Sequence, residues 1–176
     1  MEFVCCIQIP LVSRSPILMP VRWEKPSLGW VKLNTDGSSL VNPGIAGSGG
    51  LIRNSDGNWI MGFVRNIGTT GSVAAEIWAL RDGLSLCVQL QQLAVEIELD
   101  AKSVVSIFSN NTTCSGDLSP LIDYCRALLR KIPQTKMIHC FREFNFCADA
   151  LAKRGTTTTQ DFVMLSSSPQ CSIAPS

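Results

Sequence analysis

The chain has 176 residues, 45% of them hydrophobic and 16% charged, so it can bury a full core in one globular domain and is not a disordered protein. Fifteen basic and fourteen acidic residues give a formal net charge of only +1. This balance excludes a protein that binds nucleic acid through a large basic excess, so any contact with phosphate groups has to be local or mediated by a metal ion.

The ends of the chain differ in composition from its middle. Residues 3–12 form an apolar stretch that is interrupted by a glutamine and a proline. The stretch is too short to span a bilayer, and it lacks the basic start and the small-residue cleavage site of a secretory signal. We therefore expect no membrane association, a disordered leader over residues 1–22, one domain over residues 23–155 and a flexible, threonine- and serine-rich tail over residues 156–176.

Eight cysteines are present, and none of them forms a CxxC pair. They could form four disulfides, or remain reduced. His139, Cys140 and Cys147 look superficially like zinc ligands, but a second ligand pair at regular spacing is missing. Because several cysteines fall on the apolar sides of expected elements, we favour buried, reduced thiols. Reduced thiols predict an intracellular protein, in the nucleus or the cytoplasm.

The first elements predict an antiparallel meander. Residues 30–36 alternate between apolar and polar side chains, as a half-buried strand does. Residues 37–39 and 42–44 are expected to turn the chain. A glycine-rich strand over residues 46–54 and a third strand over residues 59–66 follow, joined by a loop whose residues tolerate positive φ.

Helices dominate the rest of the chain. Ser72 is expected to cap an amphipathic helix, whose apolar residues recur at three- and four-residue steps up to Val88. A helical crossover then makes the next strand parallel to the first. The later elements, in chain order, are a strand over 94–99, helices over 103–108 and 118–131, a strand over 136–141 and a helix over 145–155. This order predicts an α/β fold with a mixed five-stranded sheet, three antiparallel strands and then parallel additions, flanked by helices.

Four acidic residues, Asp36, Glu76, Asp100 and Asp149, fall where a strand or an amphipathic helix buries its neighbours. A buried acid costs free energy unless a cation or hydrogen bonds compensate it. Adjacent parallel strands open into a common crevice at their carboxyl ends, where Asp36 and Asp100 would meet. Three of the acids have structural alternatives: Asp36 in a turn, Asp100 as a cap, and Asp149 in the first turn of a helix. Glu76 has none, so the four acids together predict a metal site.

Five segments, in order, carry a resemblance to a known family. They are NTDGS at 34–38, NPG at 42–44, AEIWAL at 75–80, LDAK at 99–102 and REFN followed by DALA over 142–152. With these segments the chain resembles the type 1 ribonuclease H family over about residues 23–155. It looks closest to the plant branch of reverse-transcriptase-like domains, which are often relics of retrotransposons.

The resemblance implies an RNase H-like fold and hydrolysis of the RNA strand of an RNA–DNA hybrid, with two Mg²⁺ ions, or Mn²⁺ in their place. Magnesium prefers hard oxygen ligands, and two ions about 4 Å apart can stabilise both the attacking and the leaving oxygen. By this resemblance Asp36 bridges both ions, Glu76 and Asp100 complete one, and Asp149 completes the other.

Four more residues receive roles from the resemblance. His139, ten residues before Asp149, matches the family's assisting histidine, which helps proton transfer or product release, although a histidine at a strand end is often structural. Ser39 and Asn42 correspond to positions near the sugar edges of the hybrid, where the 2′-hydroxyl marks RNA. Asn42 can equally be only a turn residue. Lys102 either contacts a phosphate or is solvated.

Two departures from the family weaken the expected grip on the substrate. Ser72 and Val73 stand where bacterial relatives offer asparagines, and no extra basic helix fits between residues 110 and 131. The alternative function is therefore a catalytically weak or inactive nucleic-acid-binding module of retroelement origin with the same fold. We expect an RNA–DNA hybrid as the partner and a monomeric protein.

Overall fold

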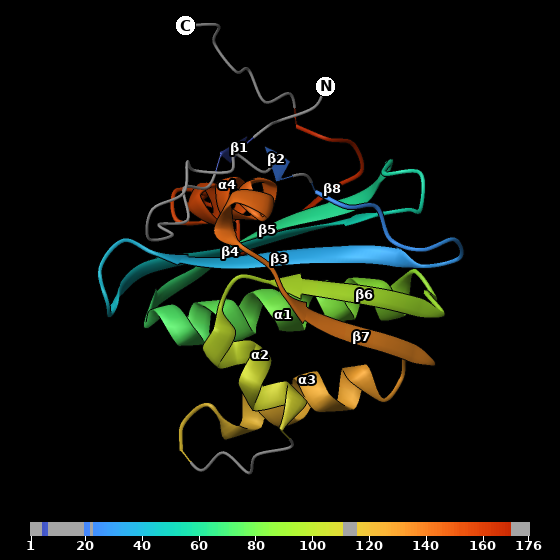
Figure 1. Ribbon diagram of the computed structural model, residues 1–176. Coiled ribbons are helices and arrows are strands. Elements are labelled where there is room, and N and C mark those ends of the chain that lie inside the picture. Colours follow the sequence, from blue (N-terminus) through green and yellow to red (C-terminus); the bar gives the residue numbers. More distant parts are fainter. Residues whose placement is uncertain (1–4, 7–19, 22, 111–115, 170–176) are drawn as a thin grey trace, which may run out of the picture.

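A computed structural model describes residues 5–6, 20–21, 23–110 and 116–169. Figure 1 shows one central sheet with helix α4 on one face and α1 on the other, and with α2 and α3 further out beside α1. The strands are β1 (Cys5–Cys6), β2 (Pro20–Val21), β3 (Val31–Ser39), β4 (Gly44–Arg53), β5 (Trp59–Thr70), β6 (Ala94–Leu99), β7 (Gln134–His139) and β8 (Phe162–Leu165). The helices are α1 (Ser72–Gln89), α2 (Lys102–Ser109), α3 (Ser119–Leu129), the 3₁₀ helix η1 (Arg142–Phe144) and α4 (Phe146–Gly155).

The strand order in the main sheet is β7-β6-β3-β4-β5-β8. Strands β3, β4 and β5 form an antiparallel meander, and β6 and β7 add to it in parallel on the β3 side. The predicted α/β class, the meander and the parallel additions are thus confirmed. Strands β1 and β2 form a separate antiparallel pair.

The predicted number of five strands is wrong, because β8 adds a sixth. It pairs antiparallel with β5 and lies in the segment that the sequence assigned to a flexible tail. Phe162 stacks on Phe63 with ring centroids 6.0 Å apart, and the Trp59 indole N–H donates to the Leu165 carbonyl at 3.0 Å. Because the strand has only four residues and lacks local periodicity, these contacts with distant residues are what hold it in place.

The predicted turn at residues 37–39 is also wrong, since these residues continue β3 and pair with β4 as far as Ser39 and Ala46. The chain reverses within residues 40–43. Asp36 therefore lies inside a long strand that is paired beyond it.

Two apolar clusters hold the layers together. The larger lies between the sheet and α1 and extends to α3, and its fully buried side chains include Leu33, Phe63, Ile77, Leu80, Leu84, Ile97 and Leu99. The smaller lies under α4 and comprises Leu51, Val64, Ala148 and Leu151. A Cβ atom on Gly49 would lie 2.4 Å from the Ala152 backbone nitrogen, so this glycine is what allows α4 to approach β4 so closely.

Among the described residues, three cysteines lie inside the molecule as free thiols, and a fourth free cysteine, Cys147, is partly buried. Cys87, Cys125 and Cys140 are buried and unpaired, and burial raises the pKa of each thiol to about 12. They are therefore protonated and unreactive at neutral pH. Within the part of the chain that the structure describes, no helix has both the length and the apolar character that a membrane span requires.

Candidate functional site

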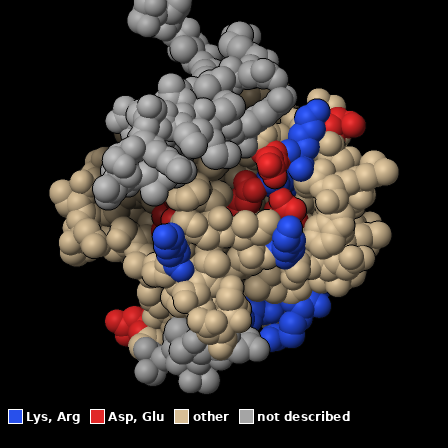
Figure 2. Space-filling view, in the orientation of Figure 1, with Lys and Arg blue, Asp and Glu red and all other residues tan. Residues whose placement is uncertain are grey.

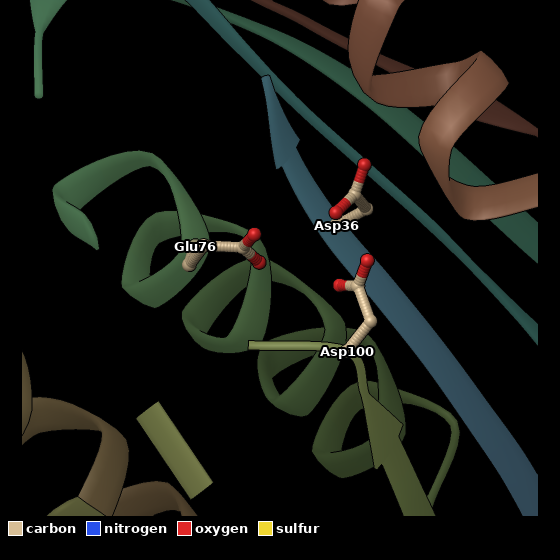
Figure 3. A group of neighbouring side chains, drawn as sticks. All are labelled: Asp36, Glu76 and Asp100. Atoms are coloured by element: carbon tan, nitrogen blue, oxygen red, sulfur yellow. The ribbon is translucent and has the colours of Figure 1, made fainter. Parts of the chain in front are cut away.

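Three of the four predicted acids converge. One carboxylate oxygen each from Asp36, Glu76 and Asp100 lies within 4.8 Å of the others. Figure 3 shows the three side chains pointing toward one another from strand β3, from helix α1 and from the end of β6. The structure therefore brings together residues that are 64 positions apart in the chain.

The sheet register explains this convergence. Strands β3 and β6 pair in parallel up to Asn34 and Glu98. Asp36 and Asp100 follow two residues later on the two strands, on the same face and just beyond the last pair. The strands thus supply two carboxylates side by side.

Glu76 reaches the same place from α1 because the helix lies directly against Gly37. A Cβ atom at Gly37 would lie only 2.3 Å from the backbone of Ala75 and Glu76, so a side chain there would push the helix away. The Gly37 N–H also donates to Glu76 Oε2 at 3.1 Å. Gly37 therefore positions Glu76 in two ways: its lack of a side chain lets α1 approach β3, and its N–H donates a hydrogen bond to the carboxylate.

Asp36 and Glu76 hold protons more tightly than isolated carboxylates do. Burial, followed by the charges of Asp100 and Asp149, raises the pKa of Asp36 to about 8. Burial, followed by the charges of Asp36 and Asp100, raises the pKa of Glu76 to about 9, although the Gly37 N–H opposes this change. Negative charge is therefore difficult to accommodate here without a cation.

A divalent metal ion fits this donor set. Among the described residues, the buried Asp100 Oδ1 atom has no hydrogen-bond partner, which leaves it available as a ligand. Three carboxylates offer the hard oxygen donors that Mg²⁺ and similar ions bind. Asp36, Glu76 and Asp100 would hold such an ion, and its charge would replace the protons that Asp36 and Glu76 otherwise retain.

Asp149 lies beside this cluster but is bound differently. It lies in the first turn of α4, and it accepts a hydrogen bond from Lys153 Nζ at 2.6 Å and another from Arg142 Nη2 at 3.1 Å. Burial alone would raise its pKa, but the hydrogen bonds and charges of Lys153 and Arg142 hold the pKa below its ordinary value. Asp149 is therefore ionised, and its charge is felt by Asp36.

His139 contacts the backbone of Asp100, and Lys102 follows Asp100 by two residues in the chain. His139 ends β7, and its Nε2–H donates to the Asp100 carbonyl at 3.1 Å. Lys102 begins α2 and is exposed to solvent. The histidine thus supports the loop that carries Asp100, and its predicted assisting role stays a prediction.

The loop between β3 and β4 uses its polar groups internally. The Ser39 hydroxyl bonds to the Val41 and Thr70 carbonyls, the latter at 3.2 Å. Asn42 Oδ1 accepts the Ser72 N–H at 3.1 Å, and so satisfies a free donor at the start of α1. The prediction that Ser72 caps this helix is wrong: Gly71 is the N-cap residue and offers no side chain, so the cap comes from a distant loop.

Sequence reasoning missed a set of buried polar residues next to the acids. Residues 31–36 were interpreted as a half-buried strand, yet all six are buried. The polar members of β3 and β6 that precede Asp36 and Asp100 on the same face are Lys32, Asn34, Glu96 and Glu98. The sequence contains a sign of this set, because polar residues alternate along both parallel strands and each series ends at a predicted metal ligand, Asp36 or Asp100.

Together, the strand order, the covering helices and the acidic cluster next to the paired strands β3 and β6 define a ribonuclease H-like protein. Residues 34–155 match the family described as reverse transcriptase-like, so the chain belongs to that family. An Arabidopsis thaliana protein named "Putative ribonuclease H protein" is 38% identical over 132 residues, which make up 75% of this chain. The matched segment spans only 21% of that longer protein.

Solved structures agree with this assignment. The N-terminal RNase H domain of a Mycobacterium tuberculosis protein has a TM-score of 0.69 and 28% identity, covering 72% of this chain and 93% of that one. RNase H1 from Halobacterium salinarum has a TM-score of 0.67 and 27% identity, and the match covers 72% of this chain and 97% of that one. LC11-RNase H1 in complex with an RNA/DNA hybrid has a TM-score of 0.67 and 24% identity, and the match covers 72% of this chain and 96% of that one. At this identity the similarity shows only that the two proteins share a fold.

Proposed function

We propose that this chain is a metal-dependent endoribonuclease that hydrolyses the RNA strand of RNA–DNA hybrids. The observation that carries the proposal is the convergence of Asp36, Glu76 and Asp100 just past the last residue pair of the parallel strands β3 and β6. Membership of the reverse transcriptase-like family and the similarity to RNase H domains support it. The hybrid bound to LC11-RNase H1 shows that a protein of this fold can hold such a substrate.

The proposed site uses all four acids. When bound, two Mg²⁺ ions would activate a water molecule and stabilise the leaving ribose oxygen. Asp36 would be a ligand of both ions, since it is buried and is affected by the charges of both Asp100 and Asp149. Glu76 and Asp100 would complete one ion, and Asp149 the other. His139, which contacts the Asp100 carbonyl, would assist proton transfer or product release.

Local cations can hold the hybrid in spite of the low net charge. Figure 2 shows acidic side chains at the centre of one face of the molecule, with lysine and arginine side chains on either side. Arg142 and Lys153 both pair with Asp149, and their side chains are 71% and 58% exposed to solvent. With Lys102 they would offer positive charge to the phosphates, and Ser39 at the end of β3 and Asn42 in the loop that follows would face the sugar edges.

Cleavage of a labelled RNA–DNA hybrid at low salt, with and without Mg²⁺, tests the proposal. We expect Mg²⁺-dependent cutting of the RNA strand and a loss of about a hundredfold or more in Asp36→Asn, since bound metal ions supply several kcal/mol of transition-state stabilisation. The substitution keeps the side-chain shape, so the fold should persist. Asp123→Asn is the matched control, because this carboxylate lies on α3 with 66% of its side chain exposed.

Equal cleavage by wild type and Asp36→Asn would show that the activity belongs to a contaminant, and the proposal would then be rejected. If the wild type binds hybrid in the presence of Mg²⁺ but leaves it uncut, the chain is instead a binding module that has kept the fold.

A further inference from the structure

A lysine is buried on the face of the sheet that leads to the acidic cluster. Lys32 is only 1% exposed, and its ammonium group donates to Glu98 Oε1 at 2.6 Å and to the Glu24 carbonyl at 2.7 Å. Glu96 Oε1 lies 2.8 Å from the same nitrogen. Burial opposes the charged form of Lys32, but its bonds with the two glutamates outweigh this effect and raise its pKa. Lys32 is therefore a fixed positive charge.

The contacts continue from Glu98 toward helix α4. Asn34 Nδ2 donates to Glu98 Oε2 at 3.0 Å and lies 3.3 Å from Asn145 Oδ1. Asn145 Nδ2 in turn donates to the Thr35 carbonyl at 2.8 Å. Asn34 and Asn145 are 2% and 1% exposed. The buried chain Lys32–Glu98–Asn34–Asn145 thus joins β6, β3 and the residue that precedes α4.

This buried chain ends at the backbone that carries two of the four acids. The Asn145 carbonyl accepts the Asp149 N–H at 3.0 Å, in the first turn of α4. Its side chain holds Thr35, the direct neighbour of Asp36. A change in the orientation of Asn145 would therefore change how Asp149 sits relative to Asp36.

We propose that Lys32 and Asn34 are positioning residues for the acidic site, holding Asn145 so that α4 presents Asp149 at a fixed place relative to Asp36. The inference rests on the proposed function, because it concerns the same acids. A positioning role also explains why these polar groups are buried. For stability alone, replacing a buried ion pair by apolar residues is often neutral or stabilising. Orienting partners of metal ligands commonly change metal affinity when removed.

Amide hydrogen exchange without metal is the first test. We expect Asn34→Ala to accelerate exchange at the Asp149 amide more than at the Leu80 amide inside α1, which reports the global stability. Asp82→Asn is the matched control. Asp82 is also only 2% exposed and bound by two arginines, Arg65 and Arg81, but it joins β5 to α1. That control should not act selectively on Asp149.

Mn²⁺ binding is the second test. Asn34→Ala is expected to weaken Mn²⁺ binding by about tenfold. Glu98→Gln keeps an acceptor for Asn34 and should stay closer to wild type than Glu98→Leu, which keeps none. The affinities are compared under conditions in which urea unfolding shows every variant to be fully folded, so that partial unfolding cannot produce this order.

The inference is overturned if Asn34→Ala leaves the Asp149 amide no more exposed than Asp82→Asn does, or if a Mn²⁺-binding wild type keeps its affinity in Asn34→Ala. A wild type that binds no Mn²⁺ contradicts the proposed function instead, and the exchange measurement alone then decides whether Asn34 positions Asp149.

Discussion

Asp36 is almost completely buried beside two further carboxylates, and a fold selected only for stability would avoid this arrangement. Its cost depends on pH. The pKa is raised from 3.8 to about 8 for Asp36, and from 4.5 to about 9 for Glu76. Between the ordinary and the raised pKa values, the folded protein binds more protons than the unfolded chain. Its free energy of unfolding must therefore decrease as pH rises through this range.

We therefore predict that the metal-free protein loses stability between about pH 4 and pH 9, with the contribution of these two acids fully present below pH 4. Urea unfolding in EDTA at pH 5, 7 and 9 measures this dependence. Asp36→Asn should flatten it, because one titrating group is gone. Mg²⁺ should stabilise the wild type most at high pH, where fewer protons compete for the ligands. Identical slopes in wild type and Asp36→Asn would contradict the assignment.

Individual residues of the site differed in how far the sequence predicted them. Asp36, Asp100 and Glu76 were predictable because each stands in a recognisable strand or helix and has few other reasons to be polar. Lys32 and Asn34 were missed, since alternation within one strand, taken by itself, does not distinguish a solvated face from a buried polar one. Only the register with Glu96 and Glu98 on β6 reveals that these polar groups satisfy one another.

At the scale of elements, the start of α1 depends on another part of the chain. Asn42 Oδ1 accepts the hydrogen bond of the Ser72 N–H. An asparagine at this position can therefore serve to cap α1, to contact the hybrid, or both. The two roles respond differently to charge, because a carboxylate is favourable at a helix N-terminus but unfavourable next to a phosphate.

Asn42→Ala is predicted to lower the free energy of unfolding by about 1 kcal/mol through the lost cap, whereas Asn42→Asp should retain the stability of the wild type or exceed it. Urea unfolding separates these variants. If Asn42 also contacts the hybrid, Asn42→Asp will raise KM for cleavage in spite of its stability. An unchanged stability in Asn42→Ala would show that the cap contributes nothing.

Elements held by local pattern were predicted well, and those held by distant partners were not. Helix α1 and strand β6 lie within two residues of their predicted bounds at their starts and ends, because their periodicity is visible in the sequence. Strand β3 extends past the glycine at 37 since β4 pairs with it, and a glycine read alone suggests a turn. Strand β8 has no pattern of its own and forms only against β5.

At the scale of the whole molecule, β8 completes the sheet at the edge opposite β7. It covers the outer side of β5 along Gly62 to Arg65. Beyond the strand, the Asn66 side chain donates to the Thr158 carbonyl at 2.8 Å, which fixes the segment between α4 and β8. An uncovered β5 would expose a row of unpaired backbone groups and part of the apolar core, a common route to self-association.

A chain that ends at residue 157 is therefore predicted to be less stable than one that ends at residue 169 by about 2–4 kcal/mol, the value expected for exposing one or two large apolar side chains. Phe162, which stacks on Phe63, and Leu165, which packs near Trp59, supply that apolar surface. Urea unfolding of the two chains, with size-exclusion chromatography to detect self-association, makes the comparison. A substitution within the longer chain, Phe162→Ala, should reproduce part of the loss without removing backbone pairing. Equal stability of the two chains would place the end of the folding unit near residue 155, as the sequence alone suggests, and would make β8 a dispensable addition.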